Sequence, residues 1–111
     1  RAEAVNRVLT AVALQEEAEE RGCTRGASNV GGFHSEVDLC KSAEVECSGL
    51  PLLLADAVRR VDRAEAAAKG RQPFQPDTMR EAWLNVSREG NWNTLHNHAG
   101  ATFSGTYFVS D

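Results

Sequence analysis

The sequence predicts an α+β chain in which helices come first and strands come last. Of its 111 residues, 41% are hydrophobic and 25% are charged, which is ordinary usage for a folded domain. Apolar residues recur at helical spacing before residue 70, whereas aromatic residues gather after residue 80, where both tryptophans and the single tyrosine lie. This change of pattern divides the chain into an N-terminal amphipathic helix (1–22), a middle part with a loop, a second helix and a proline-containing linker (23–77), and a β-rich end (78–111).

The first predicted helix covers Glu3–Glu20. Its apolar residues follow the i, i+3, i+4, i+7 spacing of one helix face, namely Val5, Val8, Leu9 and Val12. Gly22 offers a natural stop for this helix. The stretch from Gly22 to Gly49 is rich in Gly and Ser and has no sustained period, which predicts a loop with at most a short element.

The second predicted helix begins at Pro51, where the missing N–H costs nothing, and runs to Lys69, with Gly70 as its stop. One face is apolar, made of Leu54, Ala57, Val58, Val61, Ala64 and Ala68. The other carries Arg59, Arg60, Asp62, Arg63 and Glu65, and such a charged stripe is most simply a solvated surface. Gly70–Asp77 holds two prolines and is predicted to be a linker or turn.

Three strands are predicted in the last third of the chain. They cover Glu81–Ser87, Trp92–His98 and Phe103–Ser110, with a turn at Gly90 between the first two. Asp111, after the third strand, is expected to point outward rather than to bind a metal.

Net charge and hydropathy exclude some classes of binding partner. The formal net charge is −4 and the pI is about 5.4, so there is no basic footprint for nucleic acid or for an anionic membrane. The sequence has neither an apolar run of about 18 residues nor the continuous apolar stretch of a signal peptide, which favours a cytoplasmic protein. The substrate and the oligomeric state are not indicated.

The three cysteines, Cys23, Cys40 and Cys47, form no CxxC pair, and their odd number favours reduced thiols. They could form a metal or redox site with His34. The simpler interpretation is that they are small, partly buried residues, and that His34 is a loop histidine without a metal role.

His96 and His98 are the strongest candidates for chemistry. Residues two apart on a strand point to the same face, which would let both imidazoles bind one metal ion at about 2.0–2.1 Å. The competing interpretation is a pair of surface or hydrogen-bonded histidines.

The surroundings of the pair match part of a barrel-type metal motif. Gly90, His96 and His98 fit the Gly-x5-His-x-His pattern of cupins, but Thr102 and Phe103 stand where cupins place a Glu. A non-catalytic cupin-like module that binds a metal or a partner is therefore one alternative. A helical interaction segment with a degenerate barrel remnant is another.

A second resemblance covers about thirty residues up to Asp111. The chain resembles a family of 2-oxoglutarate–Fe(II) oxygenases whose core reads S-W-x-N, a Gly turn, H-x-H-P and S-G-x-Y-Y-V. The matching residues here are Ala82–Asn85, Gly90, His96–Ala99 and Ser104–Val109. Ala82, Ala99 and Phe108 depart from the pattern. The segment Val30–Ser35 and the helix Leu50–Lys69 resemble the part that precedes this core.

The resemblance implies a double-stranded β-helix (jelly-roll) barrel, of which 78–111 would be the opening strands, interrupted after the third. It implies Fe(II) held by His96 and His98, with His98 as the second ligand or as a residue just outside the ligand set, and 2-oxoglutarate contacted by Asn85 and Tyr107. The family's third ligand, a distal His, and its cosubstrate Arg have no counterpart here, so the isolated chain is expected to be inactive. From the residues alone, Trp83 and Tyr107 are at least as well explained by core packing.

Overall fold

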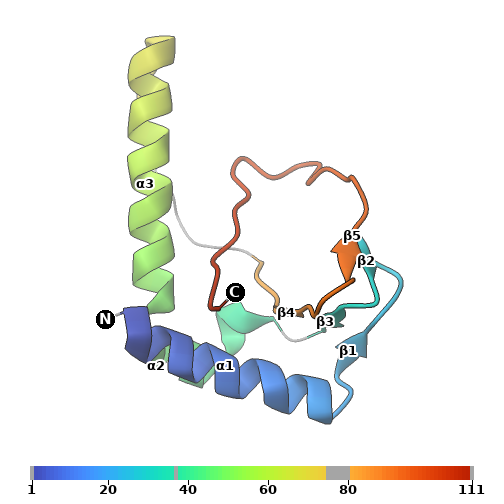
Figure 1. Ribbon diagram of the computed structural model, residues 1–111. Coiled ribbons are helices and arrows are strands. Elements are labelled where there is room, and N and C mark those ends of the chain that lie inside the picture. The colour runs from blue at the N-terminus through green and yellow to red at the C-terminus, as the bar shows by residue number, and fades with distance from the viewer. Residues whose placement is uncertain (1, 37, 75–80, 111) are drawn as a thin grey trace.

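The computed structural model describes residues 2–36, 38–74 and 81–110 and is an α+β structure with two small antiparallel sheets (Figure 1). The long helices are α1 (Ala2–Ala18) and α3 (Leu50–Lys69); the short helix α2 (Ala43–Ser48) and the 3₁₀ turn η1 (Leu39–Lys41) precede α3. The strands are β1 (Gly22–Cys23), β2 (Asn29–Val30), β3 (Phe33–Ser35), β4 (Asn85–Val86) and β5 (Trp92–Asn93). None of the helices described is both long and apolar enough to cross a bilayer.

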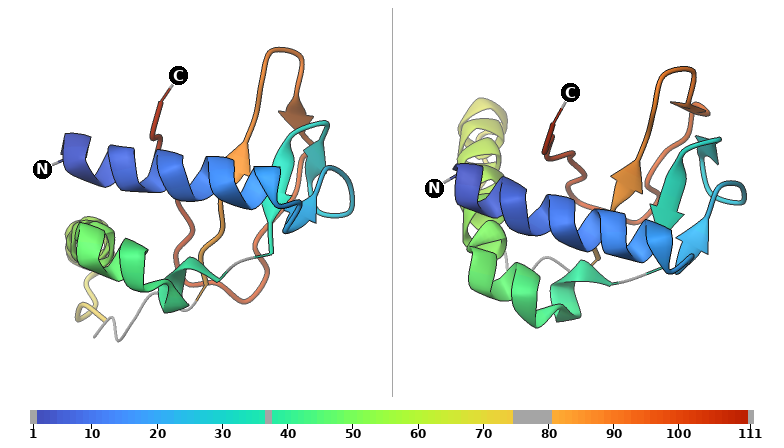
Figure 2. Two further views of the ribbon diagram at one scale, coloured as in Figure 1. Left: turned by 90° about the horizontal axis from the view of Figure 1, so that it is seen from below. Right: turned by 60° about the horizontal axis from the view of Figure 1, so that its bottom comes forward.

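The two sheets join the first half of the chain to the second. One has the order β1-β3-β4, with His34 opposite both Cys23 and Asn85. The other pairs β2 with β5, placing Val30 opposite Trp92. Figure 2 shows both sheets beside the C-terminal end of α1. The segment 22–49, predicted as a loop with at most a short element, therefore contains three strands and two short helices, because partners far along the chain complete its strands.

The first helix agrees with its prediction in position and in its buried face. Val5 and Leu9 are buried and Val12 packs against the same cluster. The helix ends at Ala18 rather than near Gly22, and Glu20 adopts a positive φ of 54°. Gly22 instead belongs to β1, where the chain lies too close to β3 for any side chain.

The second helix is also confirmed, with Pro51 in its first turn and Gly70 as its C-cap at φ 63°. Its buried face was predicted wrongly. Val61 is 56% exposed, whereas Asp62, assigned to the solvated face, is buried. Arg71 explains this, because its guanidinium donates to Asp62 Oδ1 at 2.7 Å and lets the carboxylate be buried as an ion pair.

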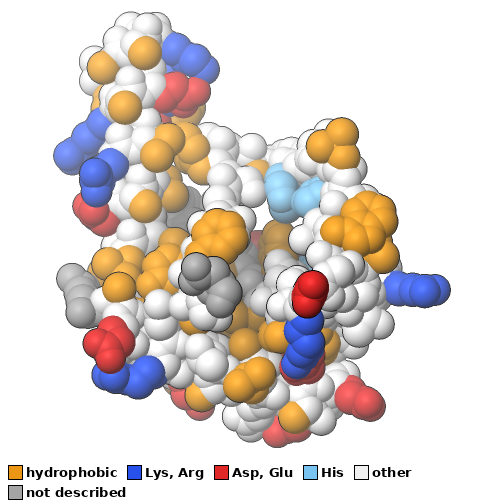
Figure 3. Space-filling model, viewed as in Figure 1, with side chains coloured by type: hydrophobic (Ala, Val, Ile, Leu, Met, Phe, Trp, Pro, Cys, Tyr) orange, Lys and Arg blue, Asp and Glu red, His pale blue; other side chains and the backbone are white. Residues whose placement is uncertain are grey.

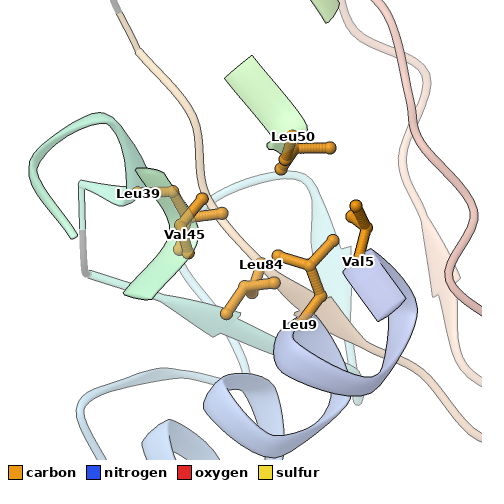
Figure 4. Packing of buried hydrophobic residues seen from close by; sticks show 6 residues of the cluster. All are labelled: Val5, Leu9, Leu39, Val45, Leu50 and Leu84. Carbon is orange, nitrogen blue, oxygen red and sulfur yellow. The ribbon is translucent and has the colours of Figure 1, made fainter. Parts of the chain in front are cut away.

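The core lies where α1 meets α2, the start of α3 and the segment before β4 (Figure 4). Its buried members are Val5, Leu9, Leu39, Val45, Leu50 and Leu84. Tyr107 and Val109 pack against this cluster from the C-terminal segment. Ser35 ties the sheet to it, because Ser35 N donates to Leu84 O at 3.0 Å and Leu84 N donates to Ser35 Oγ at 2.9 Å.

The predicted strands of the last third are much shorter in the structure. Glu81–Ser87 is reduced to β4 and Trp92–His98 to β5, while Phe103–Ser110 contains no strand. The turn before β5 is as predicted, with Asn91 N donating to Arg88 O at 2.9 Å. The β-like composition remains, but a strand requires a neighbour, and the described residues supply one only for these two short pieces. Part of the predicted linker and Asp111 lie outside the described residues.

Candidate functional site

The three histidines of the chain line one open pocket. The pocket has a volume of about 360 Å³ and is formed by Ala27, Ser28, His34, Glu81, Trp83, Thr94, His96 and His98. His34 belongs to β3, Trp83 lies just before β4, and the other two histidines follow β5. Figure 3 shows histidine side chains exposed at the surface beside hydrophobic ones. The pairing of β3 with β4 and of β2 with β5 therefore brings together residues that are distant in the sequence.

Aromatic contacts link the four rings of the pocket. Trp83 stacks with His34, with ring centroids 5.4 Å apart and planes at 18°. It also stacks with His98, at 5.8 Å and 29°. His96 meets His98 edge-on, at 5.0 Å and 72°. The indole is thus the shared neighbour of a histidine from the sheet and a histidine of the pair.

Backbone carbonyls hold two of the imidazoles. His96 Nδ1 lies 2.7 Å from Thr94 O, and His34 Nδ1 lies 2.9 Å from Ser35 O. Because a carbonyl only accepts, each Nδ1 must carry the proton in these contacts, which leaves Nε2 with a free lone pair in the neutral ring. This arrangement resembles the way that metal-binding histidines are usually oriented, with one nitrogen bonded to the protein and the other facing the metal.

The two histidines of the pair do not lie on a strand, contrary to the prediction. His96 and His98 were predicted to share one face of a strand, but β5 ends at Asn93 and both histidines lie in irregular chain. They line the same pocket because Thr94 and Trp83 position them, not because of strand alternation. A two-residue pairing with β2 is too short to extend the strand as far as the histidines.

The two residues expected to contact 2-oxoglutarate do not line the pocket. Asn85 lies in β4 and is exposed. Tyr107 packs against the core and donates its hydroxyl to Asn6 Oδ1 at 2.7 Å. Trp83, two residues before Asn85, does line the pocket.

The described residues contain no group of three or more His, Cys, Asp or Glu side chains placed to hold a metal ion. None of the three cysteines lines the pocket, and all three are free thiols, with Cys47 exposed. Burial raises the pKa of the Cys40 thiol, which keeps it protonated at neutral pH and makes it a poor ligand. For a metal, the pocket therefore offers the neighbouring imidazoles of His96 and His98, and Glu81 also lines it.

His34 is the functional candidate that sequence reasoning missed. It was predicted to be a loop residue, but it lies in β3 and contributes a ring to the pocket. A signal did exist, because Val30–Ser35 forms part of the weaker upstream resemblance. Only the pairing of β3 with β4, however, shows that His34 reaches Trp83.

Comparison with protein-family models, with curated proteins and with solved structures finds no match to this chain.

Proposed function

We propose that the chain is the N-terminal part of a 2-oxoglutarate- and Fe(II)-dependent oxygenase, and that His96 and His98 are two of its metal ligands. The proposal rests on the motif described above together with the placement of the two imidazoles in one pocket. In that family, Fe(II) supplies the chemistry that couples oxidative decarboxylation of 2-oxoglutarate to hydroxylation of a substrate.

The spacing of the two imidazoles is the observation that carries the proposal. If two imidazoles bind one ion through nitrogens at about 2.0–2.1 Å, their ring centres lie roughly 4.5–5.2 Å apart for bond angles of about 90–110°. The observed separation of 5.0 Å falls in this range. Two imidazoles leave most of the coordination sphere of Fe(II) open, as the facial-triad chemistry of this class requires, with a further protein ligand still to be supplied.

The open form of the chain supports its being part of a larger domain. Its accessible surface is 8286 Å². A compact monomer of the same mass would expose roughly 6000 Å². The radius of gyration is 15.3 Å, against roughly 13 Å for a compact chain of this length. Large apolar side chains remain exposed on both halves, including Leu52, Trp92, Leu95 and Phe108.

Metal uptake tests the proposal directly. We expect the chain to bind Co²⁺, a spectroscopic substitute for Fe²⁺, with one ion per chain in calorimetric titration. His96→Ala and His98→Ala should each abolish that binding, whereas Cys47→Ser should leave it unchanged because this exposed thiol does not line the pocket. Glu81→Gln reports whether the carboxylate on the pocket wall contributes. Binding that survives the loss of both histidines would contradict the proposal.

Turnover separates the oxygenase from the alternative of a non-catalytic cupin-like module. We expect the isolated chain with Fe²⁺ to produce no succinate from 2-oxoglutarate, because Asn85 and Tyr107 do not line the pocket and the described residues place no third ligand beside the pair. Succinate production that disappears in His96→Ala would show that this expectation is wrong. If metal affinity is indifferent to 2-oxoglutarate in the chain and in any longer form of it, the module is favoured instead.

A further inference from the structure

His98 is the less constrained of the two proposed ligands. His96 is fixed through its Nδ1 contact with Thr94 O, whereas for His98 the described residues provide only a backbone tie, from Ala101 N to His98 O at 3.1 Å. The imidazole of His98 is exposed, and its ring neighbours are Trp83 and His96. The orientation of this imidazole therefore depends on the indole against which it stacks.

Trp83 is itself positioned by His34. The indole is only half-buried and precedes β4, so the sheet does not enclose it. Its other stacked neighbour is the His34 imidazole, nearly parallel to it at 18°. The ring of His34 is well anchored, since its Nδ1 is bonded to Ser35 O and its backbone belongs to β3 in the middle of a three-stranded sheet.

Hydrogen bonds between Ser35 and Leu84 connect the core to the stacked rings of the pocket. Ser35 is 2% exposed and holds β3 against Leu84 by two hydrogen bonds. These bonds fix the relative positions of His34 and Trp83, which are the direct chain neighbours of Ser35 and Leu84. The geometry of the stack is thus determined by the best-packed part of the sheet.

We propose that His34 is a positioning residue that acts through Trp83 to orient the imidazole of His98 for metal binding. This inference rests on the proposed function, because it assumes that His98 binds the metal. His34 contributes to the site as a flat ring and not as a ligand. The usual size of aromatic-pair energies predicts a roughly 3- to 10-fold weaker metal affinity when the His34 ring is removed.

All variants carry Trp92→Phe, so that Trp83 is the only indole that can shift the ring protons of His98. In this background the test compares His34→Ala with His34→Phe. Co²⁺ affinity is measured by calorimetry, and the ring-proton shifts of His98 are measured by NMR in the metal-free protein, where the indole ring current displaces them. We expect His34→Ala to weaken Co²⁺ binding roughly 3- to 10-fold and to move the His98 shifts toward their values in unfolded chain. His34→Phe should restore both, because phenylalanine stacks but cannot bind a metal.

The outcomes distinguish this inference from the proposed function. If Co²⁺ binds through His96 and His98 but His34→Ala changes neither affinity nor shifts, the positioning role is wrong and the proposed function stands. If His34→Phe fails to restore affinity while it restores the His98 shifts, His34 acts as a ligand and the inference is overturned. If the unaltered chain binds no Co²⁺, both the proposed function and this inference fail. Circular dichroism of each variant verifies the fold.

Discussion

Asn6 joins the first helix to the end of the described chain, and its removal should cost measurable stability. Its Nδ2 donates to Val109 O at 2.9 Å, and its Oδ1 accepts from the Tyr107 hydroxyl at 2.7 Å. Both contacts are partly buried, and they span 103 and 101 residues of sequence. One amide side chain therefore satisfies two polar groups of a segment that contains no strand.

The loss in the free energy of unfolding caused by Asn6→Ala can be estimated from these two hydrogen bonds. Each net hydrogen bond contributes about 0.5–1.5 kcal/mol, so Asn6→Ala loses about 1–3 kcal/mol. Alanine recovers roughly 0.6 kcal/mol as the better helix former. The expected loss in the free energy of unfolding is thus about 0.5–2.5 kcal/mol.

Urea denaturation followed by circular dichroism measures this loss. Arg7→Ala is the matched control, because among the described residues the Arg7 side chain makes one exposed ion pair, with Glu3, and its loss should cost at most about 0.5 kcal/mol. Tyr107→Phe should cost about 1 kcal/mol, and the double variant with Asn6→Ala should show a coupling of at least about 0.5 kcal/mol. A coupling near zero, or equal effects of Asn6→Ala and Arg7→Ala, would refute the reasoning.

Two further predictions concern the sheet and the end of α1. The hydrogen bonds from Arg21 hold the pKa of Glu16 below its ordinary value. The ion pair contributes its full stability at neutral pH, and this stability is lost as the pH falls below about 4.5 toward the folded-state pKa. Glu16→Gln should therefore make the urea midpoint depend less on pH between about pH 5 and pH 3. Gly22→Ala should destabilise the fold by about 1–3 kcal/mol, since its Cβ would lie 2.2 Å from His34 O. Gly105→Ala, with open space around it, is the control and should leave the thermal midpoint unchanged.

The helices could be predicted from local signals, but the buried face of α3 could not. Pro51 and Gly70 mark its ends through backbone chemistry that acts within a few residues. Which face is buried depends on Arg71, which neutralises Asp62 and allows it to turn inward. The spacing of apolar residues carries no information about such an ion pair, so the prediction placed Asp62 on the solvent-facing side.

The strands could not be predicted from local signals, because they depend on partners that are distant in the sequence. Strand composition was recognised after residue 80, but β4 and β5 are formed only where β3 and β2 meet them. These partners lie in a Gly- and Ser-rich stretch that has no alternation of its own. The histidine pair could be identified as a candidate site from its spacing. The role of His34 depends on the pairing of β3 with β4 across about fifty residues, which local sequence patterns cannot predict.

The long reach of Asn6 also has a consequence for the order of folding. During synthesis, α1 emerges together with α2 and the start of α3, so Val5 and Leu9 can first pack against Val45 and Leu50. Tyr107 and Val109, which lie more than fifty residues further along the chain, are synthesised only roughly 3–12 s later at usual elongation rates. We therefore expect a helical nucleus that forms early on the nascent chain. The histidine pocket, whose rings come from both halves of the chain, can form only after this helical nucleus.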